Sequence, residues 1–220
     1  MPDYRIKSVH AVQVQSRRHN MAVSARVETM DGAVGKALCY AGVSVGTHEV
    51  HFQYDGGNRW GGLGCMSAVR NVNTIIADTI LGMDVRNQFE IDQAMLSIQG
   101  NGSASVGGNA IAAVSAAVLK AGAAATQMPL YRYIGGENAC MLPVPGAPAF
   151  SGGERWGGAV HTHGNKPTGA FQCFGYDSFS EASSAAWDMY HLFAKELEKR
   201  GVTEGDWFFY RIPAGIFKHS

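Results

Sequence analysis

Apolar and polar residues alternate through three consecutive stretches near the N-terminus, residues 4–15, 21–30 and 33–40. A period of two residues is typical of a strand with one buried face. Asp31 and Gly32, which separate the second stretch from the third, form a strong tight-turn signal. The pattern therefore predicts an antiparallel three-stranded meander.

A helical period replaces this alternation after residue 65. Apolar residues three or four apart predict helices over residues 66–81 and 87–98, and an alanine-rich third helix over 109–127. A glycine-rich break at 100–108 precedes the third helix, and Pro129 opens a short fourth one that stops at Gly135 and Gly136. The buried side of the second helix is expected to consist of Phe89, Ile91, Ala94, Met95 and Ile98.

The pattern of the sequence changes near Cys140 and Met141, from helical periodicity to a proline-containing strand and a glycine-rich loop. This change predicts two domains, residues 1–140 and 141–220. Residues 142–150 have the composition of an edge or barrel strand with three prolines. A long polar loop at 151–169 and a second strand at 170–176 are expected to follow. The second strand places Cys173 in a buried strand position.

Ser178 and Glu181 have the spacing of a capping box, which predicts the start of a long amphipathic helix that ends at Gly201. The period of its apolar residues predicts one buried side. That side is expected to contain Phe179, Ala182, Ala186, Met189, Tyr190, Phe193 and Leu197.

Composition excludes several classes of protein. The chain is 46% hydrophobic and 16% charged, as expected of a globular protein, and its 18 basic residues balance 18 acidic ones without a basic stripe for nucleic acid. The most apolar stretch, residues 110–125, contains Lys120 and is too short to span a bilayer. Four scattered cysteines without a CxxC pair indicate reduced thiols, so we expect a cytoplasmic protein with no membrane and no nucleic-acid partner.

One loop carries candidate chemistry: residues 41–50, AGVSVGTHEV, follow the predicted meander. Two glycines frame Ser44, and His48 and Glu49 follow directly. Glycine lets the backbone approach a ligand closely, and loops on a rigid scaffold often carry binding groups. On these grounds alone the loop is a weak indication of a site.

Several motifs in order resemble those of the enolase (phosphopyruvate hydratase) family. The family pattern S-G-A-S-T-G-x-H-E-A is similar to residues 41–50, and L-G-A-N-A-I-L-A-V-S is similar to residues 106–115. P-L-Y-R-Y-I-G-G and L-P-V-P are intact at 129–136 and 142–145. Further matches are SRRHNMAVSARV at 16–27, RWGGLGCMSAVRNVN at 59–73, HGNK at 163–166 and QCF at 172–174. The resemblance implies an α+β N-terminal domain followed by an incomplete α/β barrel.

The resemblance also implies a chemistry, the dehydration of 2-phosphoglycerate to phosphoenolpyruvate. In that reaction a lysine removes a proton, two magnesium ions stabilise the enediolate and a glutamate acts as general acid. By the same resemblance Ser44 would ligate magnesium, while His163 and Gln172 would contact the substrate. Two family glutamates are replaced, one by Cys173 and one by Trp207. The lysine and the main metal ligands belong to the later part of the barrel, beyond the resemblance seen here.

Three hypotheses follow. The first is a non-catalytic enolase-like binding or assembly subunit, which would form a homo-oligomer or join a barrel-bearing protein. The second is one half of a split magnesium-dependent lyase, whose partner chain supplies the lysine and the metal carboxylates, so that magnesium binds only in the completed site. The third is new chemistry centred on Cys173, which would need a nearby base or positive charge. His161 and His163 form a possible two-ligand metal clip, but zinc takes three or four protein ligands.

Overall fold

The computed structural model describes residues 2–16, 20–40, 50–100, 105–151 and 168–199. The chain divides into two compact units, Met1–Cys140 and Met141–Ser220, which we call unit 1 and unit 2. This division falls at the same position as the change of sequence pattern near Cys140 and Met141.

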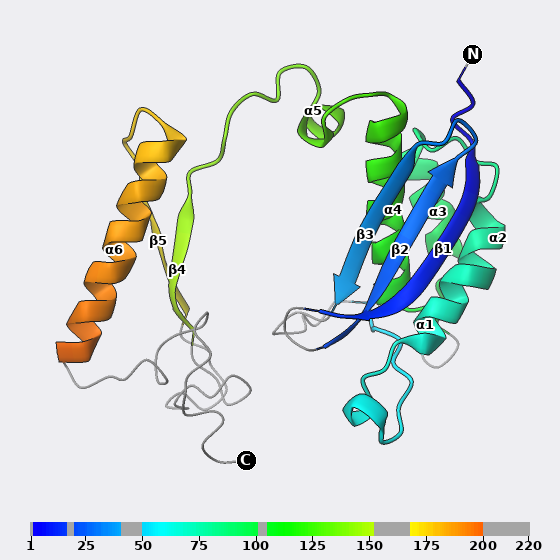
Figure 1. Ribbon diagram of the computed structural model, residues 1–220, viewed down its shortest axis with the longest axis horizontal. Coiled ribbons are helices and arrows are strands. Elements are labelled where there is room, and N and C mark those ends of the chain that lie inside the picture. The colour runs from blue at the N-terminus through cyan, green and yellow to red at the C-terminus, as the bar shows by residue number, and fades with distance from the viewer. Residues whose placement is uncertain (1, 17–19, 41–49, 101–104, 152–167, 200–220) are drawn as a thin grey trace. The chain divides into compact units, whose positions relative to one another are not determined.

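Unit 1 contains the predicted meander: β1 (Ile6–Gln15), β2 (Met21–Thr29) and β3 (Val34–Tyr40) form an antiparallel sheet in the order β1-β2-β3 (Figure 1). The tight turn after β2 is closed by a hydrogen bond from the Thr29 amide to the Ala33 carbonyl, 2.9 Å. Val23, Ala25 and Val27, which share one face of β2, are fully buried, as the alternation predicts. The sheet is therefore confirmed in type, order and turn.

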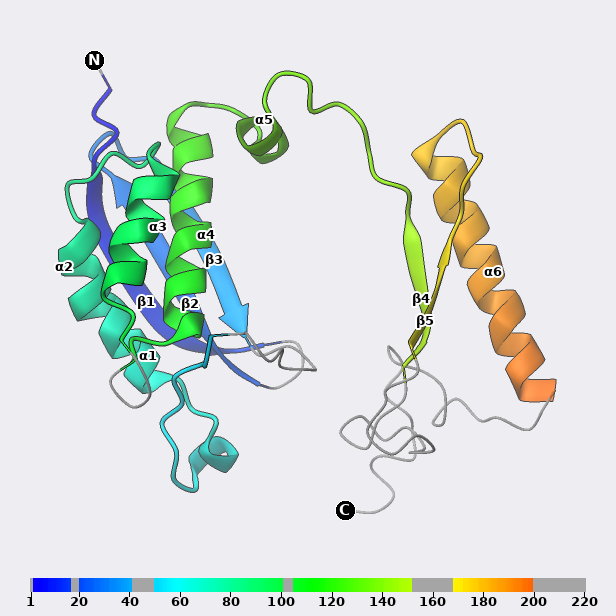
Figure 2. The same ribbon diagram turned by 180° about the vertical axis from the view of Figure 1, so that it is seen from behind.

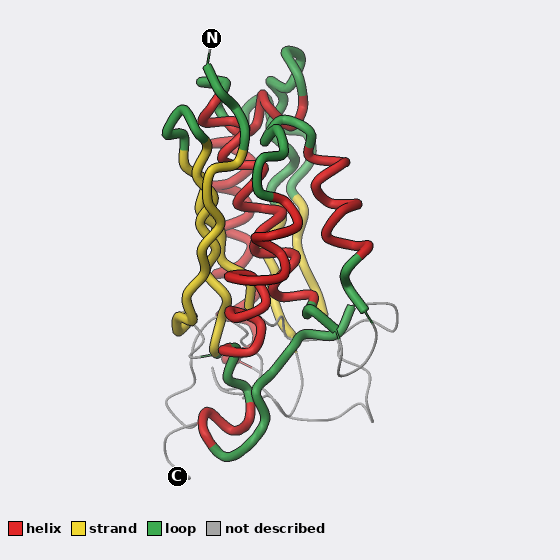
Figure 3. The backbone as a smooth tube through the Cα atoms, turned by 90° about the vertical axis from the view of Figure 1, so that its right-hand side faces the viewer, coloured by secondary structure: helices red, strands yellow, loops and turns green. Residues whose placement is uncertain are grey.

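Helices cover one face of this sheet, so unit 1 has two layers (Figures 2 and 3). The predicted first helix is one continuous rod made of α1 (Met66–Asn71), a π-helical stretch η2 (Val72–Ile76) and α2 (Ala77–Ile80). It is preceded by a short 3-10 turn, η1 (Arg59–Gly62). The remaining helices are α3 (Gln88–Ser97), α4 (Gly108–Ala125) and α5 (Leu130–Gly135).

Helix α4 lies directly against β2 and β3 and forms the centre of the core. The approach is so close that a Cβ atom at Gly35 would clash with the Ala117 carbonyl oxygen and the Ala121 nitrogen. By length and composition α4 could cross a membrane, but half of it is buried inside unit 1. The alanine-rich stretch is thus a core helix of the sheet, as expected.

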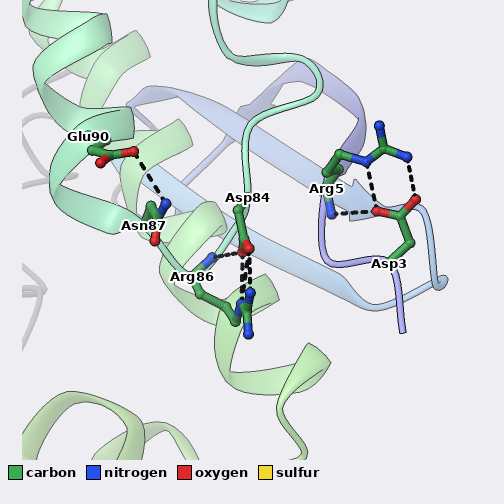
Figure 4. Close-up of polar contacts among 6 residues, drawn as sticks. All are labelled: Asp3, Arg5, Asp84, Arg86, Asn87 and Glu90. Atoms are coloured by element: carbon green, nitrogen blue, oxygen red, sulfur yellow. Dashed lines mark hydrogen bonds and ion pairs between the residues drawn. The ribbon is translucent and has the colours of Figure 1, made fainter. Parts of the chain in front are cut away.

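The segment that joins α2 to α3 pairs with the start of β1. The Ile6 amide donates to the Met83 carbonyl (2.8 Å), and the Val85 amide donates to the Tyr4 carbonyl (3.0 Å). On either side lie two local ion pairs, Arg5 with Asp3 (2.6 Å) and Arg86 with Asp84 (2.5 Å), shown in Figure 4. The guanidinium of Arg86 lowers the pKa of the Asp84 carboxyl. The start of the edge strand β1 is therefore paired by backbone hydrogen bonds on the side away from β2.

Unit 2 contains β4 (Gly146–Ser151), β5 (Thr168–Gln172) and α6 (Phe179–Lys199). The two strands are antiparallel, and α6 contacts both. The predicted capping box is present: the Glu181 amide donates to Ser178 Oγ and the Ser178 amide donates to Glu181 Oε2, each at 3.2 Å. The helix start is therefore confirmed, and within the described residues α6 extends to Lys199.

Both strands of unit 2 differ from the predicted bounds. The first begins at Gly146, after the prolines of residues 142–145, and the second ends at Gln172. Cys173 therefore follows the strand and is half-buried, so its predicted place in a buried strand is wrong. The glycine at 175, with φ +83°, starts the turn toward α6 and explains why the strand does not continue to Tyr176.

Three predicted core side chains are exposed. Phe89 is 75% exposed because it lies two residues before the buried Ile91, roughly 200° around the helix. On α6 the buried line consists of alanines (Ala182, Ala186 and Ala194). Phe179 in the first turn and Met189 at the edge of this line are each 43% exposed. The predicted helices are correct, but the predicted apolar faces are too wide.

Candidate functional site

The described chain resumes at Val50, directly after the loop that contains Ser44, and is held there by the start of α4. The Gly108 amide donates to the His51 carbonyl at 2.9 Å. One residue later, Asn109 Oδ1 accepts from the Gln53 amide (3.0 Å), and Asn109 Nδ2 donates to the Gln53 carbonyl (3.1 Å). Asn109 is only 1% exposed. A buried amide side chain thus takes the place of a strand partner for the segment that leaves the loop.

Cys65 lies beside the contact between Asn109 and Gln53. Its backbone amide donates to Gln13 Oε1 (2.6 Å), and its Sγ is 3.7 Å from Asn109 Nδ2. Burial raises the pKa of the Cys65 thiol to about 11, against the opposing effect of the Asn109 hydrogen bond. The thiol is therefore protonated at neutral pH and serves as a packing group rather than as a nucleophile.

The glycine-rich segment after Gln53 folds back as a closed loop that caps α1. The Asp55 amide donates to the Gly64 carbonyl (2.8 Å), and the Asp55 carboxylate accepts from the amides of Ser67 (2.7 Å) and Met66 (2.9 Å). Partial burial raises the pKa of Asp55, but the two amide donors outweigh it, so that the pKa is lowered from 3.8. Asp55 thus satisfies two free N–H groups of the helix from eleven residues away.

Replacement of Asp55 with alanine is expected to cost about 1–2 kcal/mol of the stability of unit 1 at neutral pH, as for other capping side chains. Because the folded-state pKa is lowered, this contribution is complete above the unfolded pKa and is lost as the pH falls through the folded value. Urea unfolding at pH 7 and at low pH measures both effects. Asp78→Ala, at an exposed aspartate of α2, is the matched control, and equal losses in the two variants would contradict the capping role.

Comparison with known proteins agrees with this geometry. Residues 6–134, which contain the sheet and its helices, match the family described as "Enolase, N-terminal domain". The chain belongs to the enolase family. It is 40% identical over 199 residues to an enolase of Campylobacter jejuni strain 81-176, a match that covers 89% of this chain and 47% of the relative. An enolase of Methanosarcina acetivorans is 40% identical over 90% of this chain and 46% of the relative, and one of Methanopyrus kandleri is 41% identical over 89% and 45%.

The chain thus spans about half the length of the curated enolases it matches. The α+β architecture implied by the resemblance is confirmed in unit 1. The overall identity shows the family but not the role of any individual residue of this chain.

Most of the enolase-like site residues predicted from the sequence lie outside the described residues: Ser44, His161, His163 and Trp207. Gln172 and Cys173 are described. Gln172 is the last residue of β5 and is exposed, and Cys173 is half-buried just after it. Within residues 2–16, 20–40, 50–100, 105–151 and 168–199, no three His, Cys, Asp or Glu side chains lie close enough to hold a metal ion.

The most informative residues of the site region, Asn109 and Asp55, were not singled out by sequence reasoning. Each contacts a segment far away along the chain, 56 residues for Asn109 and 11 or 12 for Asp55. Asn109 did carry a signal, since it is a polar residue in an otherwise apolar helix pattern and belongs to the motif at 106–115.

Proposed function

We propose that this chain is a non-catalytic enolase-family subunit that binds a barrel-bearing protein or further copies of itself. The observation that carries the proposal is Cys173, which stands where the family motif has a glutamate. A thiol lacks the carboxylate oxygens that accept strong hydrogen bonds and move protons. With this substitution the described part of unit 2 does not offer the acid–base pair that enolase chemistry requires.

Magnesium is the metal that enolase chemistry requires, and it prefers oxygen ligands, usually one or two carboxylates, together with several waters. Among the described residues, no group of three or more His, Cys, Asp and Glu side chains is placed to hold a metal ion, and the candidate ligand Ser44 lies outside them. In this proposal magnesium would bind only in a site completed by a barrel partner.

The surface of unit 2 supports association. An isolated two-stranded hairpin is only marginally stable, and the described part of unit 2 adds a single helix to one. Large apolar side chains nevertheless remain exposed on this unit: Phe174 is 69% exposed, Trp187 65% and Leu192 61%. Exposed apolar side chains of this size are available to pack against a partner. Unit 2 is thus suited to being covered by further barrel structure or by another subunit.

A second candidate is the split lyase, in which a partner chain supplies the lysine and the metal carboxylates. Gln172 favours it, because this glutamine keeps the family residue type and is exposed at the end of β5, where a partner can reach it. The two candidates share the same association and differ only in whether the completed assembly turns over substrate.

Association is tested by sedimentation velocity and by the binding of the dye ANS at micromolar protein. We expect oligomers, or a monomer that binds ANS and is captured by a barrel-bearing enolase chain. Trp187→Arg should weaken the association, whereas Lys195→Ser, at an exposed polar position of the same helix, should leave it unchanged. A monodisperse monomer that binds neither ANS nor the barrel chain would refute the proposal.

A further inference from the structure

Described residues of unit 1 line a cavity of about 510 Å³. Its volume lies in the range of small-molecule sites, about 300–1,000 Å³. The walls come from β3, from α3 and α4, and from the segment after the Ser44 loop. The lining residues are Cys39, Val50, Phe52, Asp92, Leu96, Gln99, Gly108, Ile111, Ala112 and Ser115.

Most of the wall is apolar, and Phe52, Leu96 and Ile111 supply its largest apolar side chains. Such a wall favours a ligand with an aromatic or branched aliphatic body, because burial of apolar surface stabilises the complex. Ala112 lines the cavity from an exposed position of α4, so the cavity is open to a ligand on that side.

Among the described residues that line the cavity, Asp92 on α3 is the charged one. It is held in place by Gln88, whose Nε2 donates to both Asp92 carboxylate oxygens at 3.1 Å. The same Nε2 also lies 3.1 Å from the hydroxyl and 3.2 Å from the carbonyl oxygen of Ser115 on α4, so its two N–H groups are shared among these acceptors. Gln88 thus fixes an acidic side chain and a hydroxyl from two helices at one side of the wall, which is the kind of support that a preorganised binding group needs.

The charge of the cavity selects its ligand. No Lys, Arg or His is among the described residues that line it, so an anion would meet the Asp92 carboxylate without a compensating cation. A ligand ammonium group, by contrast, would gain a charge-assisted hydrogen bond at Asp92. The phosphate and carboxylate chemistry of enolase substrates does not fit this cavity.

We propose that unit 1 carries a binding site for a small organic amine, with the ammonium group on Asp92 and Ser115 and an apolar body against Phe52, Leu96 and Ile111. The proposal does not rest on the function proposed above, because it uses only described residues of unit 1 that line the cavity. Val50, the first described residue after the Ser44 loop, lines the cavity, and the next residue, His51, is hydrogen-bonded to Gly108. A bound ligand would therefore contact the chain directly after that loop.

The test is an NMR titration of the full chain with tryptamine and, separately, with 3-indolepropionate, which has the same ring and a similar chain length but a negative charge. We expect saturable shifts of the amides of the cavity wall with tryptamine at micromolar to millimolar concentration, and none with the anion. Asp92→Asn keeps an oxygen for Gln88 but removes the charge, and should weaken binding about tenfold or more.

Ala112→Phe should fill the cavity and abolish binding. Ala124→Phe, at another exposed alanine of α4 that does not line the cavity, is the matched control and should bind tryptamine normally. If Ala112→Phe does not fold, the proposal is tested by the affinity of Asp92→Asn for tryptamine and by the comparison of tryptamine with 3-indolepropionate. Equal binding of both probes, unchanged affinity in Asp92→Asn, or no saturable binding of tryptamine would each overturn the proposal, whatever the outcome of the association experiments.

Discussion

Replacement of Gly35 with alanine is expected to destabilise unit 1 by at least about 3 kcal/mol, a cost at the upper end for overpacked cores. Gly35 is buried in β3, directly under α4. An added Cβ would overlap the Ala117 carbonyl oxygen and the Ala121 nitrogen, which are backbone atoms of a helix and cannot rotate away. Relief of the clash would require α4 to move off the sheet that it covers.

Urea unfolding followed by circular dichroism measures this cost. The matched control is Gly146→Ala in β4, where the nearest atoms to an added Cβ lie at 3.7 and 3.8 Å, an ordinary contact distance. Its effect on stability should stay within about 1 kcal/mol. If Gly35→Ala proves as stable as Gly146→Ala, the close packing of α4 on β3 is wrong.

Replacement of Asn109 with alanine is expected to cost about 2–4 kcal/mol. The side chain satisfies both the N–H and the C=O of Gln53 in a buried site, and an unpaired buried polar group costs about 1–3 kcal/mol. The loss should be accompanied by faster hydrogen exchange of the Gln53 amide, because the segment that leaves the Ser44 loop would no longer be held.

The chain offers a matched control for Asn109. Asn73 makes the same two hydrogen bonds with the backbone of one residue, accepting from the Ala11 N–H at 2.7 Å and donating to the Ala11 carbonyl at 3.1 Å. Asn73 itself is exposed, so water can replace the amide in Asn73→Ala, and the cost should be about 1 kcal/mol. Equal costs in the two variants would contradict the importance of burial at Asn109.

Local patterns predicted the elements of this fold well. The alternation before Asp31 and Gly32, and the Ser178–Glu181 pair, depend on residues close together in the chain, and both appear in the structure as expected. Periodicity predicted the helices but not the width of their buried faces. Phe89 belongs to the predicted apolar side of α3, yet it lies roughly 200° around the helix from the buried Ile91 and is exposed.

Contacts between distant segments could not be predicted in the same way. The hydrogen bonds between Asn109 and Gln53 and the capping of α1 by Asp55 each depend on how the glycine-rich segment folds back. The cavity depends on the spacing between α3, α4 and the end of β3, and no local pattern specifies that spacing. The predictions on Ser44, His163 and Trp207 concern residues outside the described part of the chain and stay predictions.

The central claim, that this enolase-family chain is non-catalytic by itself, is tested most directly by phosphoenolpyruvate formation from 2-phosphoglycerate with magnesium present. The purified chain is measured alone and then with a barrel-bearing enolase chain, and Cys173→Glu is measured in parallel. The account predicts no turnover by the chain alone, with or without this substitution. Turnover only in the mixture would favour the split lyase, and turnover by the isolated wild-type chain would contradict the account.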